Sequence, residues 1–301
     1  MQLLELTPEQ IKLAQEAVAA RFINNSVAYQ CIPIERVKID ETTIRWDRYD
    51  YERSRVVDNE SLSLPEPYAE VNFTRSQKDE LDMKRAMTTI HRKTSELTRF
   101  FDAMAFVGLQ EAIKNKTLTG VVIPDPSEFK FISLREAAIQ VEEEEGREPI
   151  LVDPSDSQES LVSSGFQAVF KLEEYGYYSN YFSVWGEHIW ALLNKPEQHD
   201  SVRPKEILQD TIQDFYRSST LPPDEAIVVS LDGPTLKYII ATEEDSASSE
   251  NNKLVFFEPF EIETDSRKEQ IYKYQVKFRA VPCVQEIRSI VRIKLAPCGA
   301  I

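Results

Sequence analysis

Glycine and histidine are scarce in this chain, with eight glycines and three histidines among 301 residues. The glycine-rich patterns that hold nucleotide phosphates, GxxxxGK[ST] and GxGxxG, do not occur. The zinc-binding patterns CxxC and HExxH and the nucleophile pattern GxSxG do not occur either. The sequence thus offers no recognisable active site, and we expect no enzyme activity, no cofactor and no metal site.

Cysteines and long apolar runs are also few. Cys31, Cys283 and Cys298 are odd in number and far apart, which favours reduced core thiols over a disulfide framework. No apolar run approaches the roughly 20 residues that a membrane helix needs. The first ten residues, MQLLELTPEQ, lack the basic region and apolar core of a signal peptide. We expect a protein that is neither secreted by the usual route nor inserted in a membrane.

Basic residues are outnumbered, with 35 Lys and Arg against 51 Asp and Glu and a formal net charge of −16. A protein that grips DNA or RNA along the phosphates needs a basic stripe, so this balance argues against that task. It is compatible with a wall that encloses nucleic acid without binding it tightly. A hydrophobic content of 42% is enough for the core of two domains or of one large discontinuous domain.

Three groups of residues suggest chemistry, but each has a simpler interpretation. His188 stands beside Glu187 in the segment WGEHIW, where a histidine on the flank of a packed helix is the simpler reading. The aromatic residues of 175–182 could form a platform for a sugar or a base, yet few basic residues accompany them, which favours packing. The carboxylates 142–145 read as a solvated helix end.

Two helices are predicted in the first third of the chain. Thr7, Pro8 and Gln10 form an N-terminal capping box, which predicts an amphipathic helix over 8–23. An apolar seam with alternating steps of four and three predicts one long helix over 76–111, about 50 Å in length. Its last turns are apolar all round, which favours burial against a sheet over a coiled-coil dimer. The seam consists of Met83, Met87, Ile90, Thr94, Leu97, Phe101, Met104 and Gly108.

Strands are predicted on both sides of this helix. Residues 37–73 are β-prone, charged and free of glycine, which predicts an exposed hairpin whose partner lies elsewhere. The alternative is an ordinary surface hairpin with its turn near Asp58-Asn59. Two alternating runs end the chain, at 271–280 and 287–295. Between these regions we expect helices over 133–146, 161–174 and 204–215, and strands 225–231 and 236–242 paired across Asp232-Gly233.

This order of parts resembles the HK97-type shell proteins, which comprise the major capsid proteins of tailed phages and the encapsulins. Four stretches carry the resemblance. LTRFFDAMAFVGLQEA (97–112) is similar to the end of the family's spine helix, with Phe106-Val107-Gly108 as its Phe-x-Gly. LEEYGYYSNYFSVWGEHIWALL (172–193) and LPPDEAIVVSLDGPTLKYIIATE (221–243) resemble parts of its axial domain. FFEPFEIETDSRKEQIYKYQVKFRAVPCVQEIRSIVRIKL (256–295) resembles its closing segment.

The resemblance implies an α+β fold in four parts. These are an N-terminal arm (1–36), an extended loop (37–75), a peripheral domain with the long spine helix (76–131 and 253–282) and an axial α/β domain (132–252 and 283–301). In this family the late strands pair with the spine-helix region, which explains why regular strands end the chain. The extended loop would lie on a neighbouring subunit and contact it through Arg45, Trp46, Arg48, Tyr49 and Arg53.

The leading functional hypothesis is a major capsid protein of a tailed double-stranded DNA virus. Many copies would form the pentamers and hexamers of an icosahedral head, assembled in the host cytoplasm, around DNA that is not bound sequence-specifically. Decoration, scaffold and portal proteins would be further partners. The alternative is an encapsulin, a cytoplasmic shell whose cargo enzyme docks a peptide against the N-terminal helix. A hypothesis from another class is a small-molecule- or glycan-binding enzyme that uses residues 175–190 and runs as a monomer or small oligomer.

Overall fold

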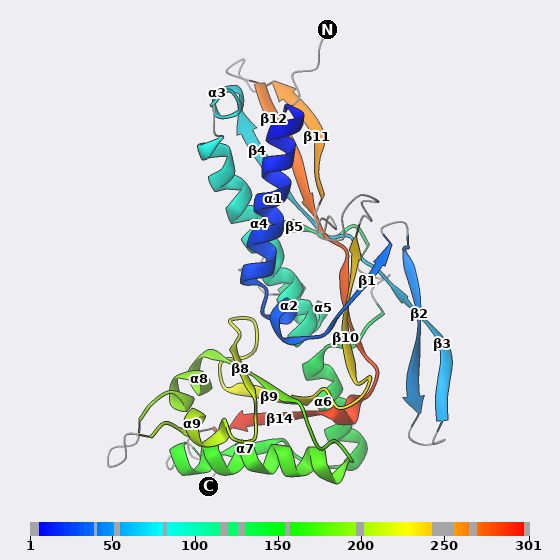
Figure 1. Cartoon of the computed structure of the whole chain (residues 1–301), viewed down its shortest axis with the longest axis vertical. Coiled ribbons are helices and arrows are strands. Elements are labelled where there is room, and N and C mark those ends of the chain that lie inside the picture. The colour runs from blue at the N-terminus through cyan, green and yellow to red at the C-terminus, as the bar shows by residue number, and fades with distance from the viewer. Residues whose placement is uncertain are drawn as a thin grey trace.

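The computed structural model describes residues 6–38, 41–50, 55–80, 83–114, 120–125, 130–153, 157–196, 202–242, 256–264 and 270–297. Of these, the side chains of 47–50, 55–60, 78, 157, 256–264 and 270 are not described. Figure 1 shows an elongated molecule with the N-terminal helix at one end and a compact α/β unit at the other. Helices and strands both contribute to each end, and the fold class is α+β as predicted.

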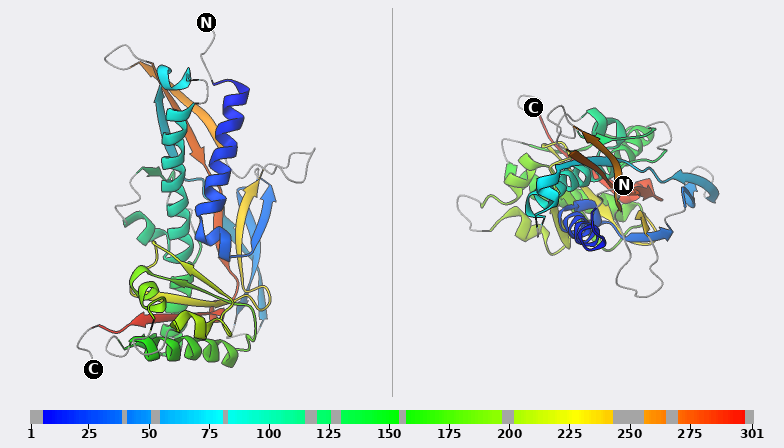
Figure 2. Two further views of the ribbon diagram at one scale, coloured as in Figure 1. Left: turned by 60° about the vertical axis from the view of Figure 1, so that its left-hand side comes forward. Right: turned by 90° about the horizontal axis from the view of Figure 1, so that it is seen from above.

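Two helices, α1 (Pro8–Asn25) and α4 (Lys84–Phe106), lie side by side and run in the same direction at the first end of the molecule (Figures 1 and 2). The capping box is confirmed, because the Gln10 amide donates to Thr7 Oγ1 at 3.2 Å and the Thr7 amide donates to Gln10 Oε1 at 3.0 Å. After α1, Ser26 caps the short helix α2 (Val27–Cys31).

The predicted helix over 76–111 is wrong in length, because the chain forms three helices there. The short helix α3 (Arg75–Lys78) precedes α4, and α5 (Leu109–Lys114) follows it. Met83 stands at the N-cap of α4 with a left-handed φ of 48°. Gly108 ends α4 with a φ of 98°, and a Cβ there would lie 2.4 Å from Glu136 Oε1. Left-handed residues interrupt a helix whatever its apolar spacing, so α4 is about 35 Å long.

A four-stranded antiparallel sheet packs against α4. Its order is β11 (Phe256–Thr264), β12 (Gln270–Lys277), β4 (Tyr68–Thr74) and β5 (Val121–Val122). The predicted alternation of the first terminal strand is confirmed, since Tyr272, Tyr274 and Val276 are buried. Phe278 continues this face, with its ring centroid 4.0 Å from that of Phe22 of α1. The late strand therefore completes the core around α1 and α4.

A three-stranded sheet joins the two ends of the molecule. In it β10 (Leu236–Thr242) lies between β1 (Ile34–Lys38), which is parallel, and β13 (Ala280–Val284), which is antiparallel. The predicted pairing of 225–231 with 236–242 is wrong, because the earlier segment belongs to another sheet. The chain does turn near Asp232-Gly233, where Thr235 Oγ1 donates to the Ser230 carbonyl at 2.7 Å. At that turn the chain passes from the sheet that contains 225–230 to the three-stranded sheet, so the turn does not close a hairpin.

The α/β unit contains a five-stranded sheet. Its order is β6 (Ile150–Val152), β14 (Ile290–Leu295), β9 (Glu225–Ser230), β7 (Tyr181–Trp185) and β8 (Asp214–Arg217). Its helices are α6 (Leu134–Glu145), α7 (Ser157–Glu174), α8 (Glu187–Leu193) and α9 (Pro204–Leu208). Strand β9 is buried throughout: Ala226 and Val228 join the core under α7, while Ile227 and Val229 join the core that continues to α4.

Two sequence predictions in this unit need correction. The helix expected over 204–215 ends at Leu208, and 214–217 forms β8, parallel to β7. The run 287–295 begins with a 3-10 turn at Ile287–Ser289 before β14. Helix α6 begins with a capping box of Ser133 and Glu136, and the short helix α8 follows Gly186. Parallel pairing with a strand 30 residues earlier is a tertiary effect, which local propensity does not reveal.

A separate two-stranded hairpin projects beside the three-stranded sheet (Figure 1). It consists of β2 (Thr43–Asp50) and β3 (Arg55–Ser63), and within the described residues these strands pair only with each other. The predicted hairpin is therefore present, but its strands lie within 43–63, and the range 37–73 is wrong at both ends because Val37 belongs to β1 and 68–74 forms β4 of the four-stranded sheet. The turn expected near Asp58-Asn59 is wrong, because both residues lie inside β3.

Candidate functional site

The projecting hairpin is the first candidate site, and among the described side chains it is the base that packs on the rest of the chain. Leu62 and Leu64 are buried in a small cluster with Ile239 and Ala241 of β10 and Val281 of β13. The direct strand pairs continue from this base to Asp50 opposite Arg55. An isolated two-stranded hairpin is at best marginally stable in water, so one of this length needs a further surface to rest on.

The residues predicted to make subunit contacts lie along this hairpin. Arg45 is exposed, and Trp46 is half-buried and packs on the cluster at the hairpin base. Arg48 and Tyr49 lie in β2, but their side chains are outside the described residues, as is the whole of Arg53. The structure thus places Arg45 and Trp46 near the base, where Trp46 contributes to the hairpin's attachment to its own chain.

The apolar seam of α4 faces the chain's own core. Met83, Ile90, Leu97, Phe101 and Met104 are all buried, and Met87 is half-buried. Thr94 is also buried and satisfies its hydroxyl by donating to the Ile90 carbonyl at 2.8 Å. Because α1 and the sheet already cover the seam, it is not the contact surface of a coiled-coil dimer.

A buried carboxylate, which the sequence reasoning missed, attaches the N-terminal arm to α4. Asp102 accepts from Ser26 Oγ at 2.7 Å, from the Val27 amide at 3.0 Å and from the Ala28 amide at 3.1 Å. It therefore satisfies the first amides of α2, where a negative charge is favourable. Burial nevertheless raises the pKa of Asp102 to about 6, against these hydrogen bonds, which lower it. The sequence did contain a signal for this buried carboxylate, because Asp102 is an acidic residue inside the apolar run FFDAMAF.

Asp102 should make stability depend on pH in a predictable direction. Its folded-state pKa of about 6 lies above the ordinary value of 3.8, so the folded chain holds the proton more tightly than the unfolded chain. This contribution is fully present below about pH 4 and is lost as the pH rises towards 6. We expect the stability of wild type relative to Asp102→Asn to fall across this window and to stay flat above it, measured by urea unfolding at a series of pH values. A stability difference between wild type and Asp102→Asn that stays constant with pH would contradict the raised pKa of Asp102.

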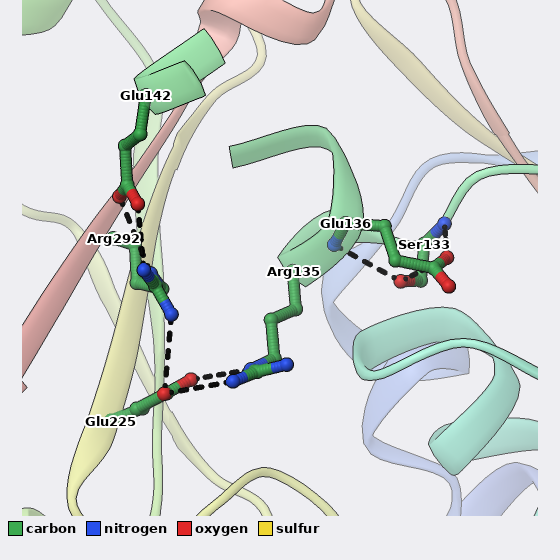
Figure 3. A network of polar contacts seen from close by, with 6 residues as sticks. All are labelled: Ser133, Arg135, Glu136, Glu142, Glu225 and Arg292. Carbon is green, nitrogen blue, oxygen red and sulfur yellow. Dashed lines mark hydrogen bonds and ion pairs between the residues drawn. The ribbon is translucent and has the colours of Figure 1, made fainter. Parts of the chain in front are cut away.

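A buried ion-pair network joins α6, β9 and β14 in the α/β unit (Figure 3). Arg292 Nη2 donates to Glu142 Oε2 at 2.6 Å, and Arg292 Nη1 donates to Glu225 Oε1 at 3.3 Å. Arg135 completes the network with donors to both oxygens of Glu225, at 2.6 and 3.0 Å. The side chains of Arg292, Glu142 and Glu225 are 10%, 9% and 4% exposed.

The predicted solvated helix end over 142–145 is therefore wrong for two of its residues. Glu142 is buried in the network, and Glu145 accepts a hydrogen bond from Tyr175 and pairs with Arg147 and Arg288. Arg288 and Arg292 are distant from α6 in the sequence, so a local reading could not place them. The pairs hold the end of α6 to the last strands of the chain.

The remaining candidate residues are those of the aromatic segment 175–182, His188 and the cysteines. Within the aromatic segment, Tyr177, Tyr181 and Phe182 are buried, which agrees with packing, and Tyr178 is exposed. His188 is exposed, with Nδ1 2.9 Å from Asp224 Oδ1. Cys31 and Cys283 are buried thiols, and Cys298 lies outside the described residues.

Two features are absent from the described residues, a membrane-spanning helix and a cluster of metal ligands. None of the helices found there has the length and apolar character needed to cross a bilayer. Likewise, within those residues no three His, Cys, Asp or Glu side chains are grouped as metal ligands would be.

Comparison with known proteins places the chain by structure alone. No protein-family model matches it, and no curated protein matches it. A virus-like particle from Pyrococcus furiosus is similar in structure, with a TM-score of 0.63 and 10% identity, over 95% of this chain and 100% of that one.

Two further solved structures are similar. Mycobacterium phage Cain aligns with a TM-score of 0.58 and 9% identity, over 91% of this chain and 92% of that one. The SrpI encapsulin of Synechococcus elongatus PCC 7942 aligns with a TM-score of 0.51 and 10% identity, over 98% and 89%. The three alignments each extend over nine-tenths or more of this chain. The chain has the HK97-like shell-protein fold.

Proposed function

We propose that the chain is a self-assembling shell subunit, and specifically the major capsid protein of a tailed double-stranded DNA virus. Copies would form pentamers and hexamers that close into an icosahedral head. The observation that carries the proposal is the projecting hairpin, whose strands pair only with each other among the described residues. Such an element has a physical reason to exist if a neighbouring copy covers it.

The whole-chain structural likeness supports the same proposal. The aligned structures include a phage and a virus-like particle, and the alignments extend over more than nine-tenths of this chain. A net charge of −16 suits a wall that encloses DNA without adhering to it over its whole surface. Scaffold, decoration and portal proteins are the partners that a viral shell would require.

We also propose a division of the chain that follows the sheets. The extended loop would be the hairpin 43–63, since β4 pairs with β12 in the sheet behind the spine helix. The peripheral domain would comprise that sheet with α1 and α4. The axial domain would comprise the five-stranded sheet with α6 to α9, and the three-stranded sheet would connect the two.

An encapsulin is the second candidate, favoured by the position of α1. This amphipathic helix lies along α4 and is anchored by Ala14, Val18 and Phe22, which are fully buried. A cargo peptide would have a helix to dock against in that case. The similarity to the SrpI encapsulin, at a TM-score of 0.51, supports this reading as well.

Negative-stain electron microscopy of the chain expressed alone tests the proposal. We expect closed shells, tubes or capsomers in the particle fraction. Absorbance at 260 and 280 nm and gel analysis of that fraction separate the candidates: a co-purifying enzyme favours the encapsulin, and particles without a cargo enzyme favour the viral capsid. A stable monomer or small oligomer with no particles would contradict both and favour a binding protein or enzyme.

A further inference from the structure

Exposed apolar side chains gather in a groove between α7 and the segment that forms α9. Among the described residues, Phe170, Val202 and Ile207 are large, apolar and exposed, and all three border this groove. Val162 and Phe166 of α7 are half-buried and complete its apolar wall. The groove has a volume of about 590 Å³ and belongs to the α/β unit, at the opposite end of the molecule from the start of α1 (Figure 1). Contiguous exposed apolar surface of this kind marks a contact with another molecule.

Helix α7 is apolar on two sides, and its own chain fully covers only one of them. Leu161 and Leu172 are buried in the core against the five-stranded sheet. Val162, Phe166 and Phe170 follow one another at steps of four on another face, and Phe170 is 60% exposed. Side chains four residues apart lie one above the other on a helix, so these three form a continuous stripe. A surface helix needs one apolar stripe for its own core, and the second stripe therefore indicates a second packing partner.

The groove is shaped by the chain's own packing. Gly165 lies where α7 meets α9, and a Cβ at this position would lie 2.6 Å from Leu208 Cδ2. Glycine thus permits the close approach of the two helices. Lys205 of α9 has its Nζ atom 5.3 Å from the ring centroid of Trp190 and 5.5 Å from that of Phe215, and such cation–π contacts hold α9 from its other side. The groove therefore exists before any partner binds.

The lining of the groove is nearly uncharged, although the chain has a net charge of −16. Among the described residues that border it, Glu159 is the one charged residue, and the other polar residues are Gln158, Ser163 and Gln167. Two copies of an acidic chain repel each other where carboxylates meet, so they can approach at a surface that is apolar and depleted of charge. A basic partner would instead be attracted to surfaces rich in carboxylates. The distribution of charge therefore favours a second copy of this chain as the occupant.

We propose that this groove is an interface between two copies of the chain related by a twofold axis. The surface carries a projection, the exposed ring of Phe170, beside the depression between α7 and α9. A surface with both features can be covered by its own copy, because a twofold contact brings the same patch of each copy together. Phe170 of each copy would contact the apolar wall of the other copy's groove. The inference goes beyond the proposed shell function, since pairing requires neither the projecting hairpin nor a particle.

Sedimentation velocity of the full chain, cleared of particles by pelleting, tests the pairing between about 1 and 50 µM. We expect a dimer whose share rises with concentration by mass action. Phe170→Gln should raise the dimer dissociation constant at least tenfold, because aromatic side chains at the centre of an interface carry much of its binding energy. Phe170→Leu should keep most of the pairing. The matched control is Tyr178→Gln, which removes a 70% exposed ring outside the groove and should pair as wild type does.

Cysteine cross-linking provides a readout that does not depend on whether particles form. Ser163 is exposed and borders the groove, whereas Ser179 is exposed beyond the C-terminal end of α7. With a short bismaleimide, Ser163→Cys should give dimers as the main product. Ser179→Cys should give at least tenfold less, and wild type sets the background from the native cysteines. If all of the wild type enters particles, cross-linking alone decides.

Free wild type that stays monomeric at 50 µM would overturn the proposal, as would a Ser163→Cys variant that forms no more dimer than Ser179→Cys. Equal weakening of the dimer by Tyr178→Gln would overturn it as well. Rings of five or six unassembled copies that depend on Phe170 would replace the twofold contact with a head-to-tail contact. Protection of Ser163→Cys from a maleimide dye only inside particles, without a cross-linked dimer, would assign the groove to a different partner surface. Circular dichroism of each variant confirms folding.

Discussion

Shortening the projecting hairpin is expected to abolish particle formation while the subunit stays folded. The change replaces residues 47–59 with Asn-Gly. Trp46 and Glu60 are directly opposite each other in the strand register, so a two-residue turn can join them. The buried base residues Leu62 and Leu64 are retained, and the removed strands pair only with each other among the described residues. We therefore expect a small change in the melting temperature but at least a tenfold loss of particles.

Sedimentation and electron microscopy measure the particles, and circular dichroism measures the fold. Trp46→Ala alone provides the comparison, because Trp46 packs on the cluster at the hairpin base. That variant should lower the stability of the subunit more than the shortened hairpin does, and it should reduce assembly less. Normal particles from the shortened variant would show that the hairpin makes no essential contact with a neighbouring copy.

The second large effect is expected at Arg292. Arg292→Met removes the cation between Glu142 and Glu225 and leaves Glu142 buried without a positive partner. Breaking a buried ion pair in this way costs about 3–5 kcal/mol. That is a large fraction of the roughly 5–15 kcal/mol by which a domain is stable. The midpoint of urea unfolding, measured on unassembled subunits, should fall accordingly.

Two further variants test the cause of this loss. Glu142→Leu combined with Arg292→Met removes both charges, and we expect it to recover most of the stability, because apolar pairs often replace buried ion pairs without a loss. Arg217→Met is the exposed control, since Arg217 is 51% exposed and pairs with Glu187 at 2.6 Å. It should cost about 1 kcal/mol or less. If Arg292→Met lowers the free energy of unfolding no more than Arg217→Met does, the ion pairs of the network contribute no more than an exposed pair.

These two sites differ in how far the sequence revealed them. The hairpin was visible as a charged β-prone stretch without a core, and its strands formed as expected. The network was hidden, because Glu142 belongs to an acidic run that looks solvated until Arg292, 150 residues later, lies against it. Asp102 is intermediate between these two cases. An acidic residue within an apolar helical turn indicates a buried carboxylate with a partner, but the sequence does not show that the partner is Ser26.

The sequence by itself determined the features that depend on near neighbours. The capping boxes at Thr7 and Ser133 set where α1 and α6 begin, and period-two alternation set the buried face of β12. Tertiary structure decided the rest, since segments 225–230 and 236–242 adjoin in sequence but join different sheets. Turn chemistry and side-chain spacing act over a few residues, whereas strand partners and ion pairs depend on which distant segments the core brings together.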